Sequence, residues 1–343
     1  MNQVVSGFHS GVSMDISVDV GSGLTKWQTA DSGGCFPSAV GETAHLVESD
    51  FQVQSYADDT VTISLRRSEH AYIVGAAADR LLRQEHRADT LTPDWATKRE
   101  YRALLYRALS EGLPPNYNGP IRLCVGLPQA FYEKLKPRLV SDLTGTHKFS
   151  VGDAHYQVTV KEDSLFVIPQ AMGVFFYHTA QDPDSALHDV VCVIDVGTFT
   201  TGYSLINHGM FDRAKSGGIE VGIASLSKQV RSYISSQFGH RLDLPVATKA
   251  TIQGKVRIQG KSHSLRSAIP TLAGTLADEI TDVLQDRWGN DSATALILVA
   301  GGGAEYILPA LKKRWPHVKM AAEDKEAPMV IVRGYAHYLA AQA

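Results

Sequence analysis

The segment DVGSGLTK, residues 19–26, places a carboxylate, a glycine–serine–glycine turn and a lysine next to one another. Alternating runs on either side predict a β-hairpin that turns at Gly21–Gly23. Gly and Ser are common in any hairpin turn, so an ordinary turn is one interpretation. The other is a phosphate site, where backbone N–H groups, the Ser22 hydroxyl and the Lys26 ammonium face an anion. In such a site Asp19 would hold Mg²⁺ through water.

The segment CVIDVGTFTTG, residues 192–202, repeats this pattern about half a chain later. The residues that repeat the first turn's features are Asp195, Gly197, Thr198 and Thr200. An ordinary turn after a buried strand is again an alternative. Two matching turns in one chain favour the phosphate interpretation. The two turns would contact the β- and γ-phosphates from opposite sides, with a metal between the two carboxylates.

The repeat and the length of 343 residues predict an α/β protein with two similar domains that flank a ligand cleft. We predict a first domain at 14–180, completed by a C-terminal helix at 332–343, and a second at 188–331. Residues 1–13 are polar and lack the layout of a signal peptide. We expect them to form a flexible tail, with Met14 as an alternative start.

A third glycine turn lies in LILVAGGGAEYIL, residues 296–308. Gly301, Gly302 and Gly303 follow a buried strand, and Ala304 begins a helix. Such a turn lets a flat ligand lie directly on the backbone, and a helix N-terminus favours nearby negative charge. A flexible connection between strand and helix is the alternative, although it rarely needs three consecutive glycines.

Composition describes an ordinary globular protein, with 44% hydrophobic and 20% charged residues and a net charge of −3. This charge gives no reason to expect direct binding to DNA or to an anionic membrane. Cys124 and Cys192 lie in apolar runs far from Cys35, which predicts buried thiols and a cytoplasmic protein. The 13 histidines lack zinc-site spacing, and no G-x-S-x-G elbow indicates a serine hydrolase.

Apolar periodicity predicts the remaining elements. The strands are VTISL, AYIVGA, IRLCVGLP and YQVTV; the helices are 94–112, 131–143 with an interruption at Pro137, 169–180, and two near 222–237 and 268–288. We also predict a glycine-rich turn at Ser216–Gly222. In MVIVRGYAHYLAAQ, residues 329–342, we predict a strand end or loop that runs into a terminal helix.

The segment GKVRIQGKS, residues 254–262, looks like a P-loop, but five residues separate its two glycines instead of four. It lies in a region that repeats IQGK and carries Lys249, Lys255, Arg257, Lys261 and Arg266. We predict an exposed hairpin there and favour it over a DNA contact.

The three glycine turns, in this order, resemble those of the actin-fold ATPases, which include actin, DnaK-type chaperones and sugar kinases. DVGSGLTK resembles the first phosphate loop, IDVGTFTTG the second and VAGGGAEYI the adenosine loop. VIPQAMGVFF and VRGYAHYLA are similar to the two helices that connect the domains. The resemblance implies two actin-like (RNase H-like) domains that bind ATP and Mg²⁺ in the cleft between them.

Within this superfamily the sequence is similar to bacterial ParM/StbA-type plasmid-segregation actins. That likeness implies a filament-forming ATPase that acts on DNA through a centromere-binding adaptor protein. It implies that Asp19 and Asp195 serve the metal, that Gln170 positions the attacking water, and that the turns bind the nucleotide. The nucleotide-binding residues are Asp19, Gly21, Ser22, Gly23, Leu24, Lys26, Gly197, Thr198, Thr200, Gly301, Gly302, Gly303 and Ala304.

Two departures from the family pattern leave the metal geometry and the hydrolysis rate open. Gly202 stands where relatives often carry an acid, and Thr198 replaces a common glycine or aspartate. A non-polymerising nucleotide-binding adaptor of the same fold is the main alternative function. A small-molecule kinase is a weaker one, because the sequence shows neither a catalytic base nor a substrate pocket.

Overall fold

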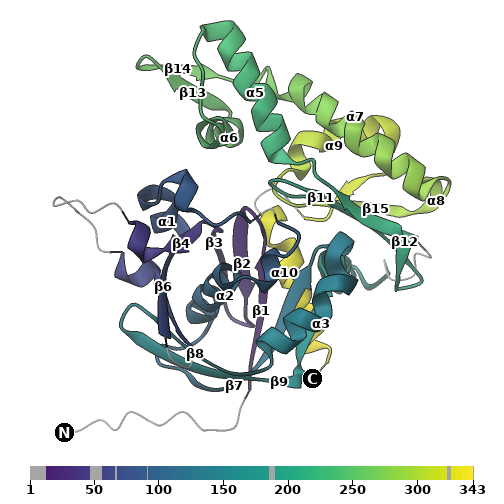
Figure 1. The fold of residues 1–343 in the computed structure, drawn as a ribbon. Helices are drawn as coiled ribbons and strands as arrows, with labels where there is room; N and C mark the ends of the chain where they lie inside the picture. Colours follow the sequence, from purple (N-terminus) through teal and green to yellow (C-terminus); the bar gives the residue numbers. More distant parts are fainter. Residues whose placement is uncertain are drawn as a thin grey trace, which may run out of the picture. The chain divides into compact units, whose positions relative to one another are not determined.

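The computed structural model describes residues 13–46, 56–65, 68–90, 92–184, 190–322 and 326–342. The predicted tail, residues 1–13, therefore lies outside the described residues except for Ser13. The chain divides into two compact units (Figure 1). Unit 1 comprises Met1–Gly126, Glu133–Ile168 and Tyr338–Ala343, and unit 2 comprises Leu127–Tyr132 and Pro169–His337.

Unit 1 is built on a nine-stranded sheet with the order β3-β2-β1-β7-β9-β8-β5-β6-β4. Its strands are β1 (Met14–Val20), β2 (Leu24–Gln28), β3 (Gly33–Pro37), β4 (Val40–Glu42), β5 (Thr60–Leu65), β6 (Ser68–Val74), β7 (Asn118–Leu127), β8 (Gly145–Val151) and β9 (Ala154–Pro169). Its helices are α1 (Gly75–Leu81), α2 (Arg99–Gly112) and α3 (Tyr132–Leu143). The predicted first hairpin is confirmed, because β1 pairs with β2 in antiparallel register.

Helix α2 forms the central packing element of unit 1, where it lies against β1 and β2. The apolar positions that predicted this helix, from Tyr101 to Leu109, are buried. Trp95 is buried too, but it lies in a separate 3₁₀ turn before the helix. Cys124 is buried in β7, as predicted, and is a free thiol.

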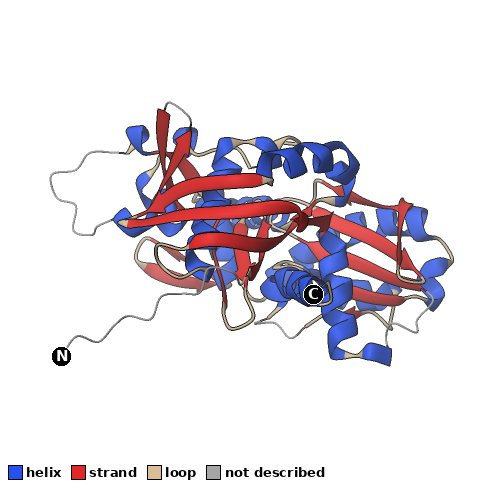
Figure 2. Cartoon of the chain, turned by 90° about the horizontal axis from the view of Figure 1, so that it is seen from below, coloured by secondary structure: helices blue, strands red, loops and turns tan. Residues whose placement is uncertain are grey.

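Unit 2 is built on a five-stranded sheet with the order β12-β11-β10-β15-β16, plus a separate two-stranded ladder, β13-β14 (Figure 2 shows strands in red). Its strands are β10 (Val190–Val196), β11 (Thr201–Asn207), β12 (Met210–Ile219), β13 (Lys255–Ile258), β14 (Lys261–Ser264), β15 (Leu296–Ala300) and β16 (Lys319–Met320). Its helices are α4 (Gln170–Gln181), α5 (Ile223–Phe238), α6 (Leu244–Gln253), α7 (Ile269–Trp288), α8 (Asp291–Thr294), α9 (Ala304–Arg314) and α10 (Val330–Ala340), whose last residues fall in unit 1.

The two faces of the unit 2 sheet are covered by different helices. Cys192, Ile194 and Val196 of β10 pack in one apolar cluster with buried residues of α5, α7 and α9. Side chains alternate along a strand, so Val193 and Asp195 face the other side. Helix α4, which packs against β10 and β11 but contributes nothing to that cluster, covers this second face.

Three predictions of local structure were wrong. Helix α3 runs from Tyr132 to Leu143 with Pro137 inside it, so the proline does not interrupt the helix. The second error concerns the glycine-rich turn predicted at Ser216–Gly222, whose first three residues lie within β12. There Gly217 faces the Tyr203 ring, and the Ser216 hydroxyl accepts a hydrogen bond from the Leu205 N–H at a bulge.

The third error concerns residues 329–332, where an apolar run predicted a strand end or loop. They close a 3₁₀ turn and begin α10. A short apolar run does not by itself distinguish a strand from a buried helix. Here the helix is favoured because Gly334 of α10 and Gly173 of α4 let the two helix backbones approach closely.

The exposed hairpin predicted in the basic segment is confirmed, since β13 and β14 pair in antiparallel register around Gln259 and Gly260. Helices α5 and α7 match the two predicted near 222–237 and 268–288. No helix in the described part of the chain combines the length and the apolar character needed to cross a bilayer.

Candidate functional site

In unit 1, the first glycine turn lies beside a part-buried ion pair. The Lys26 ammonium lies 2.7 Å from an oxygen of Asp19, whose side chain is only 1% exposed. The two residues are register partners across β1 and β2, so the hairpin itself brings them together. A side chain at Gly21 would meet the Leu24 carbonyl at 2.9 Å and the Lys26 ammonium at 3.3 Å. The absence of a side chain at Gly21 therefore leaves room for the Lys26–Asp19 ion pair.

Hydroxyl groups from elsewhere in unit 1 hold the same turn. Ser38 donates from its hydroxyl to the Gly21 carbonyl at 2.6 Å, and Thr90 donates to the Ser22 carbonyl at 2.9 Å. Tyr101 of α2 is fully buried near Asp19; burial raises the pKa of its phenol, and the Asp19 carboxylate raises it further. These three residues were not in the sequence-based site, because nothing in their local sequence links them to a turn that is distant along the chain.

In unit 2, the second glycine turn lies where β10 and β11 join. The Gly197 N–H bonds the Thr200 carbonyl at 2.9 Å and closes the turn. The first N–H groups of α5 extend it, since Ile223 donates to the Gly197 carbonyl and Ala224 to the Thr198 carbonyl. The N-terminus of α5 is thus fixed directly beside the turn.

The third glycine turn packs against the second. The Gly303 N–H donates to the Val196 carbonyl at 2.9 Å, and β15 pairs in parallel with β10 so that Ala300 lies opposite Asp195. Gly301 has a φ of +88°, and a side chain there would meet the Val196 carbonyl and lie 2.5 Å from an Asp195 carboxylate oxygen. The structure therefore brings together Asp195, the Gly197–Thr200 turn and the Gly301–Ala304 turn, as well as the N-termini of α5 and α9.

Gly202 is the register partner of Asp195, in the position that Lys26 has opposite Asp19. The amide of Gln129 fills the space above it, with its Oε1 3.1 Å from where a Gly202 side chain would begin. Partners in an antiparallel ladder carry their side chains on the same face. The Gln129 amide therefore lies on the Asp195 face of the sheet, and its nitrogen is buried without a hydrogen-bond partner among the described residues.

Gln129 was missed by sequence reasoning. It lies in the short segment Leu127–Tyr132, which belongs to unit 2 although the chain on both sides of it belongs to unit 1. Only the unusual glycine at 202 hinted that another group occupies that space. Gln170, the predicted water-positioning residue, is the first residue of α4, the helix that covers the same face of the sheet as Asp195.

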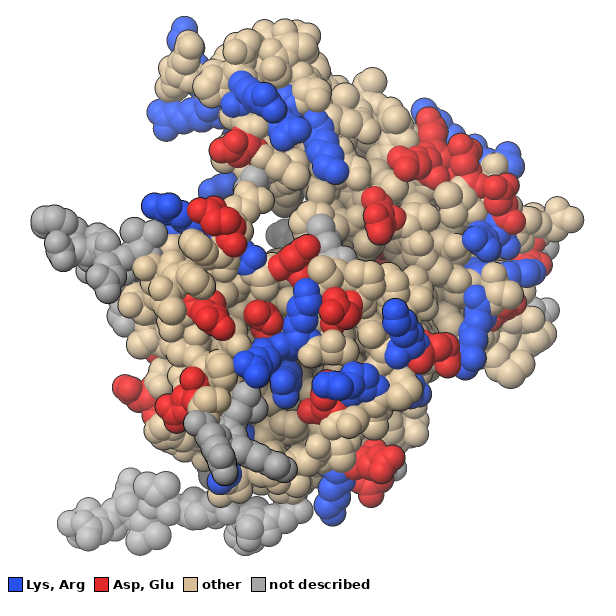
Figure 3. Space-filling model, in the orientation of Figure 1, with Lys and Arg blue, Asp and Glu red and all other residues tan. Residues whose placement is uncertain are grey.

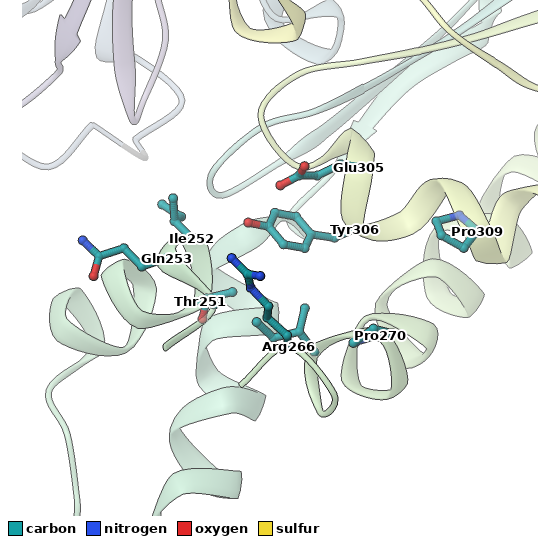
Figure 4. Close-up of a pocket in the computed structure, with 10 residues that line it drawn as sticks. Thr251, Ile252, Gln253, Arg266, Pro270, Glu305, Tyr306 and Pro309 are labelled. Carbon is teal, nitrogen blue, oxygen red and sulfur yellow. The ribbon is translucent and has the colours of Figure 1, made fainter. Parts of the chain in front are cut away.

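A pocket of about 380 Å³ lies next to the third turn in unit 2. Its lining residues are Thr251, Ile252, Gln253, Gly254, Arg266, Ile269, Pro270, Glu305, Tyr306 and Pro309 (Figure 4). Arg266 lies on Gly254, with its Cγ 3.2 Å from where a side chain at that glycine would begin. Burial raises the pKa of Tyr306 to about 12, and Glu305 contributes, so its phenol remains a hydrogen-bond donor.

Comparison with known proteins identifies the fold. Residues 17–173 match the family model of the N-terminal domain of actin-like proteins. Residues 193–313 match the C-terminal domain of the archaeal actin homologue MreB-like proteins. The chain is an actin-like protein. The predicted fold class, two actin-like domains of mixed α/β structure, is confirmed.

Solved structures with the same fold cover nearly the whole of this actin-like chain. A 15-stranded ParM filament from Clostridium botulinum has a TM-score of 0.78 at 21% identity, covering 96% of this chain and 99% of its own. A non-polymerisable quadruple mutant of pCBH ParM has a TM-score of 0.75 at 22% identity, covering 95% and 99%. An archaeal actin homolog, Ta0583, in complex with ADP has a TM-score of 0.77 at 18% identity, covering 96% and 100%. No curated protein matches the chain in sequence.

The residues of the turns fit a magnesium nucleotide. Carboxylate oxygens suit Mg²⁺, which keeps several waters and is commonly held by one or two carboxylates together with phosphates. Gly202 and Gly301 remove the side chains that would otherwise surround Asp195 in unit 2. The pocket beside Tyr306 lies within the size range of sites for small organic ligands.

Proposed function

We propose that this actin-like protein binds ATP with Mg²⁺ through its three glycine turns. The observation that carries the proposal is the convergence, in unit 2, of Asp195, two glycine turns and two helix N-termini. In this assignment Gly197, Thr198 and Thr200 bind phosphate, Gly301–Ala304 support the nucleoside, and the base enters the pocket beside Tyr306. The ADP complex of the archaeal homolog supports nucleotide binding by this fold.

The first glycine turn, in unit 1, would supply a cation and hydrogen-bond donors to the phosphates. Lys26 supplies a cation, while the backbone of Gly21–Leu24 and the hydroxyl of Ser22 supply hydrogen-bond donors. Asp19 orients Lys26 through their ion pair and would help to hold the hydrated metal. Asp195, which has a glycine opposite it instead of a lysine, is the main metal-binding carboxylate.

Hydrolysis needs an ordered water more than covalent chemistry from the protein. Mg²⁺ would neutralise charge on the phosphates, and the protein would orient the water for in-line attack. We assign the positioning of this water to Gln170, which lies at the start of the helix that covers the Asp195 face of the sheet. The Gln129 amide supplies a further polar group on that face, where relatives often carry an acid.

We further propose that ATP drives assembly into filaments that segregate plasmid DNA through a centromere-binding adaptor. Similarity in fold to a ParM filament supports the first part of this proposal. A nucleotide that binds one conformation better shifts the population towards it and towards the surfaces it presents. Head-to-tail contacts that do not close into a ring then give open polymers.

Sedimentation and light scattering with ATP, ADP and no nucleotide test the proposed function. We expect a critical concentration that is lower with ATP than with ADP, and calorimetric binding of ATP in the presence of Mg²⁺. A protein that binds ATP but stays monomeric or dimeric at all concentrations is instead the non-polymerising adaptor. A protein that binds no nucleotide contradicts both assignments.

A further inference from the structure

Two glycines lie on neighbouring strands of the unit 2 sheet, in line with Asp195. Gly202 of β11 is the register partner of Asp195, and Gly218 of β12 is the register partner of Gly202. Partners in an antiparallel ladder carry their side chains on the same face. The Asp195 face therefore has no side chain at this level on either β11 or β12, and we call the two glycines the glycine row.

The segment Leu127–Tyr132 fills the space above the glycine row. Its 3₁₀ turn packs against both β11 and β12. The Gln129 Oε1 lies 3.1 Å from where a side chain at Gly202 would begin. The Ala130 Cβ lies 3.9 Å from the corresponding position at Gly218. The glycine row therefore determines where the Gln129 amide lies on the Asp195 face.

The group that this segment brings to the Asp195 face is a neutral one. The residues of the 3₁₀ turn are Gln129, Ala130 and Phe131, so the turn carries no charge. Figure 3 shows that Lys and Arg side chains of unit 2 gather over α5, α6 and the β13–β14 hairpin. The amide can both donate and accept a hydrogen bond, which a lysine or an arginine cannot do.

The Gln129 amide nitrogen is buried and has no hydrogen-bond partner among the described residues. A buried donor without a partner destabilises a fold, and an apolar side chain of similar size would fill the same space without that cost. Packing alone therefore does not explain an amide at this position. Gln129 as a whole is half-buried, so small rotations of its side chain can bring the nitrogen to an acceptor.

A second unpaired polar group lies on the same face of the sheet. Ser204 of β11 is two residues from Gly202 and is the register partner of Val193, so its side chain is on the Asp195 face. Ser204 is 0% exposed, and its hydroxyl has no hydrogen-bond partner among the described residues. Buried polar groups that a chain leaves unpaired are commonly paired by ordered water. The two groups together indicate that water belongs on this face.

We propose that the Gln129 amide binds the water that attacks the γ-phosphate of ATP, together with Gln170. This inference rests on the proposed function, because that water is the nucleophile of ATP hydrolysis. Gln170 begins α4, the helix that covers the same face of the sheet. The Gln129 nitrogen donates a hydrogen bond to the water oxygen, and the water donates one to the Gln170 oxygen. The second lone pair of the water remains free to attack.

The two amides orient the water and take no part in the covalent change. The water oxygen forms a bond to the γ-phosphorus, and the bond from that phosphorus to the bridging oxygen breaks with its electron pair on ADP. Both water protons leave with the released phosphate. The assignment also explains Gly202, because a larger residue there would occupy the position of the Gln129 amide.

The first test replaces the amide with an apolar side chain of similar size, Gln129→Met. We expect ATP hydrolysis to slow about tenfold or more, because the water loses one of its two orienting groups, with the affinity for ATP unchanged. The melting temperature without nucleotide should stay the same or rise, because the variant lacks the unpaired buried donor. A residue that only supports the fold would show a lower melting temperature instead.

The second test moves the amide from the segment to the strand. The three atoms nearest to a side chain at Gly202 all belong to the Gln129 amide, so Gly202→Asn alone should lower the melting temperature. Gln129→Ala removes these atoms and should slow hydrolysis. Combining Gln129→Ala with Gly202→Asn should restore part of the lost rate. Combining it with Gly202→Ala, the matched control, fills space without an amide and should leave the rate low.

A third measurement does not depend on turnover. ADP with aluminium fluoride imitates the phosphoryl group during transfer, and its binding in the presence of Mg²⁺ can be measured by calorimetry. We expect Gln129→Met to weaken this binding by about the same factor as it slows hydrolysis, since the lost hydrogen bond acts in the transition state. Binding of ADP alone should be equal in the variant and the wild type.

The outcomes separate this inference from the proposed function. Wild-type protein that binds no ATP contradicts the proposed function, and the inference fails with it. Wild-type protein that hydrolyses ATP, with a Gln129→Met variant equal to it in turnover and in binding of ADP with aluminium fluoride, overturns the inference alone. A Gln129→Met variant that melts lower, together with no rescue by Gly202→Asn in the double variant, also overturns it and makes Gln129 a structural residue.

Discussion

The two hairpins that carry Asp19 and Asp195 have the same backbone arrangement, but they differ in the residue opposite the aspartate. In unit 1 the register partner of Asp19 is Lys26, and the two side chains form a part-buried ion pair of 2.7 Å. In unit 2 the register partner of Asp195 is Gly202, and an amide from Gln129 fills the space. One hairpin therefore places a lysine opposite its aspartate, and the other places a residue without a side chain opposite its aspartate.

This difference assigns different roles to two turns that look alike in sequence. A carboxylate next to a fixed ammonium has part of its charge balanced before any metal arrives. The register partner of Asp195 is a glycine and supplies no such cation. We therefore expect unit 2 to carry the metal and the hydrolysis step, and unit 1 to carry the cation that faces the phosphates.

The largest expected effect comes from replacing the two aspartates in turn. Asp195→Asn should lower the rate of ATP hydrolysis by about 10²–10³-fold, since a preorganised charge at the reacting phosphate is lost. Asp19→Asn should lower it by less, because Lys26 remains. Steady-state phosphate release measures both rates, and Gln170→Ala should reduce turnover while ATP stays bound. Equal losses for the two aspartate variants would remove the distinction between the turns.

The next effect concerns stability. Lys26→Met leaves the Asp19 carboxylate buried without its cation, which should lower the free energy of unfolding by about 3 kcal/mol. The double variant Lys26→Met with Asp19→Asn should recover part of this loss, because the unpaired charge is gone. Urea denaturation followed by circular dichroism measures both. A Lys26→Met protein as stable as the wild type would show that the ion pair is not needed to hold the turn.

Sequence patterns predicted the two hairpins, the strand before the third glycine turn and most helices, because each depends on local periodicity and turn residues. They did not predict the partners that fill the site. Gln129, Ser38 and Thr90 reach the turns only through the tertiary fold, and no local pattern marks them. Glycines at 217 and 218 looked like a turn but lie within a strand, where Gly217 provides room for the Tyr203 ring.

Gly301 gives a smaller and more local test of unit 2. With a φ of +88° and Asp195 in the path of any side chain, Gly301→Ala should lower the free energy of unfolding by about 2 kcal/mol and weaken ATP binding. Gly302→Ala is the matched control, because its side chain would meet only Ile223, at 3.8 Å. Thermal unfolding and calorimetry compare the two. Two alanine variants that behave alike would contradict the close packing of the third turn on Asp195.

The smallest effect is the acid sensitivity of unit 1. Burial lowers the pKa of His147 below its ordinary 6.5, with Arg102 adding to this, although the hydrogen bond to the Leu143 carbonyl opposes it. The unfolded chain therefore takes up a proton before the folded chain does. Stability from this residue is complete above pH 6.5 and falls as the pH drops below it.

His147→Gln should accordingly flatten the loss of melting temperature between about pH 7 and pH 5. Thermal scans of the variant and the wild type across this range give the comparison. An unchanged pH profile would mean that other groups cause the acid sensitivity.

The most direct test of the central claim is calorimetric binding of ATP with and without Mg²⁺, for the wild type and for Asp195→Asn. The account predicts that Mg²⁺ tightens ATP binding to the wild type and has little effect on the variant, because Asp195 holds the metal. ATP binding that Mg²⁺ strengthens equally in both proteins, or no binding by the wild type, would contradict it.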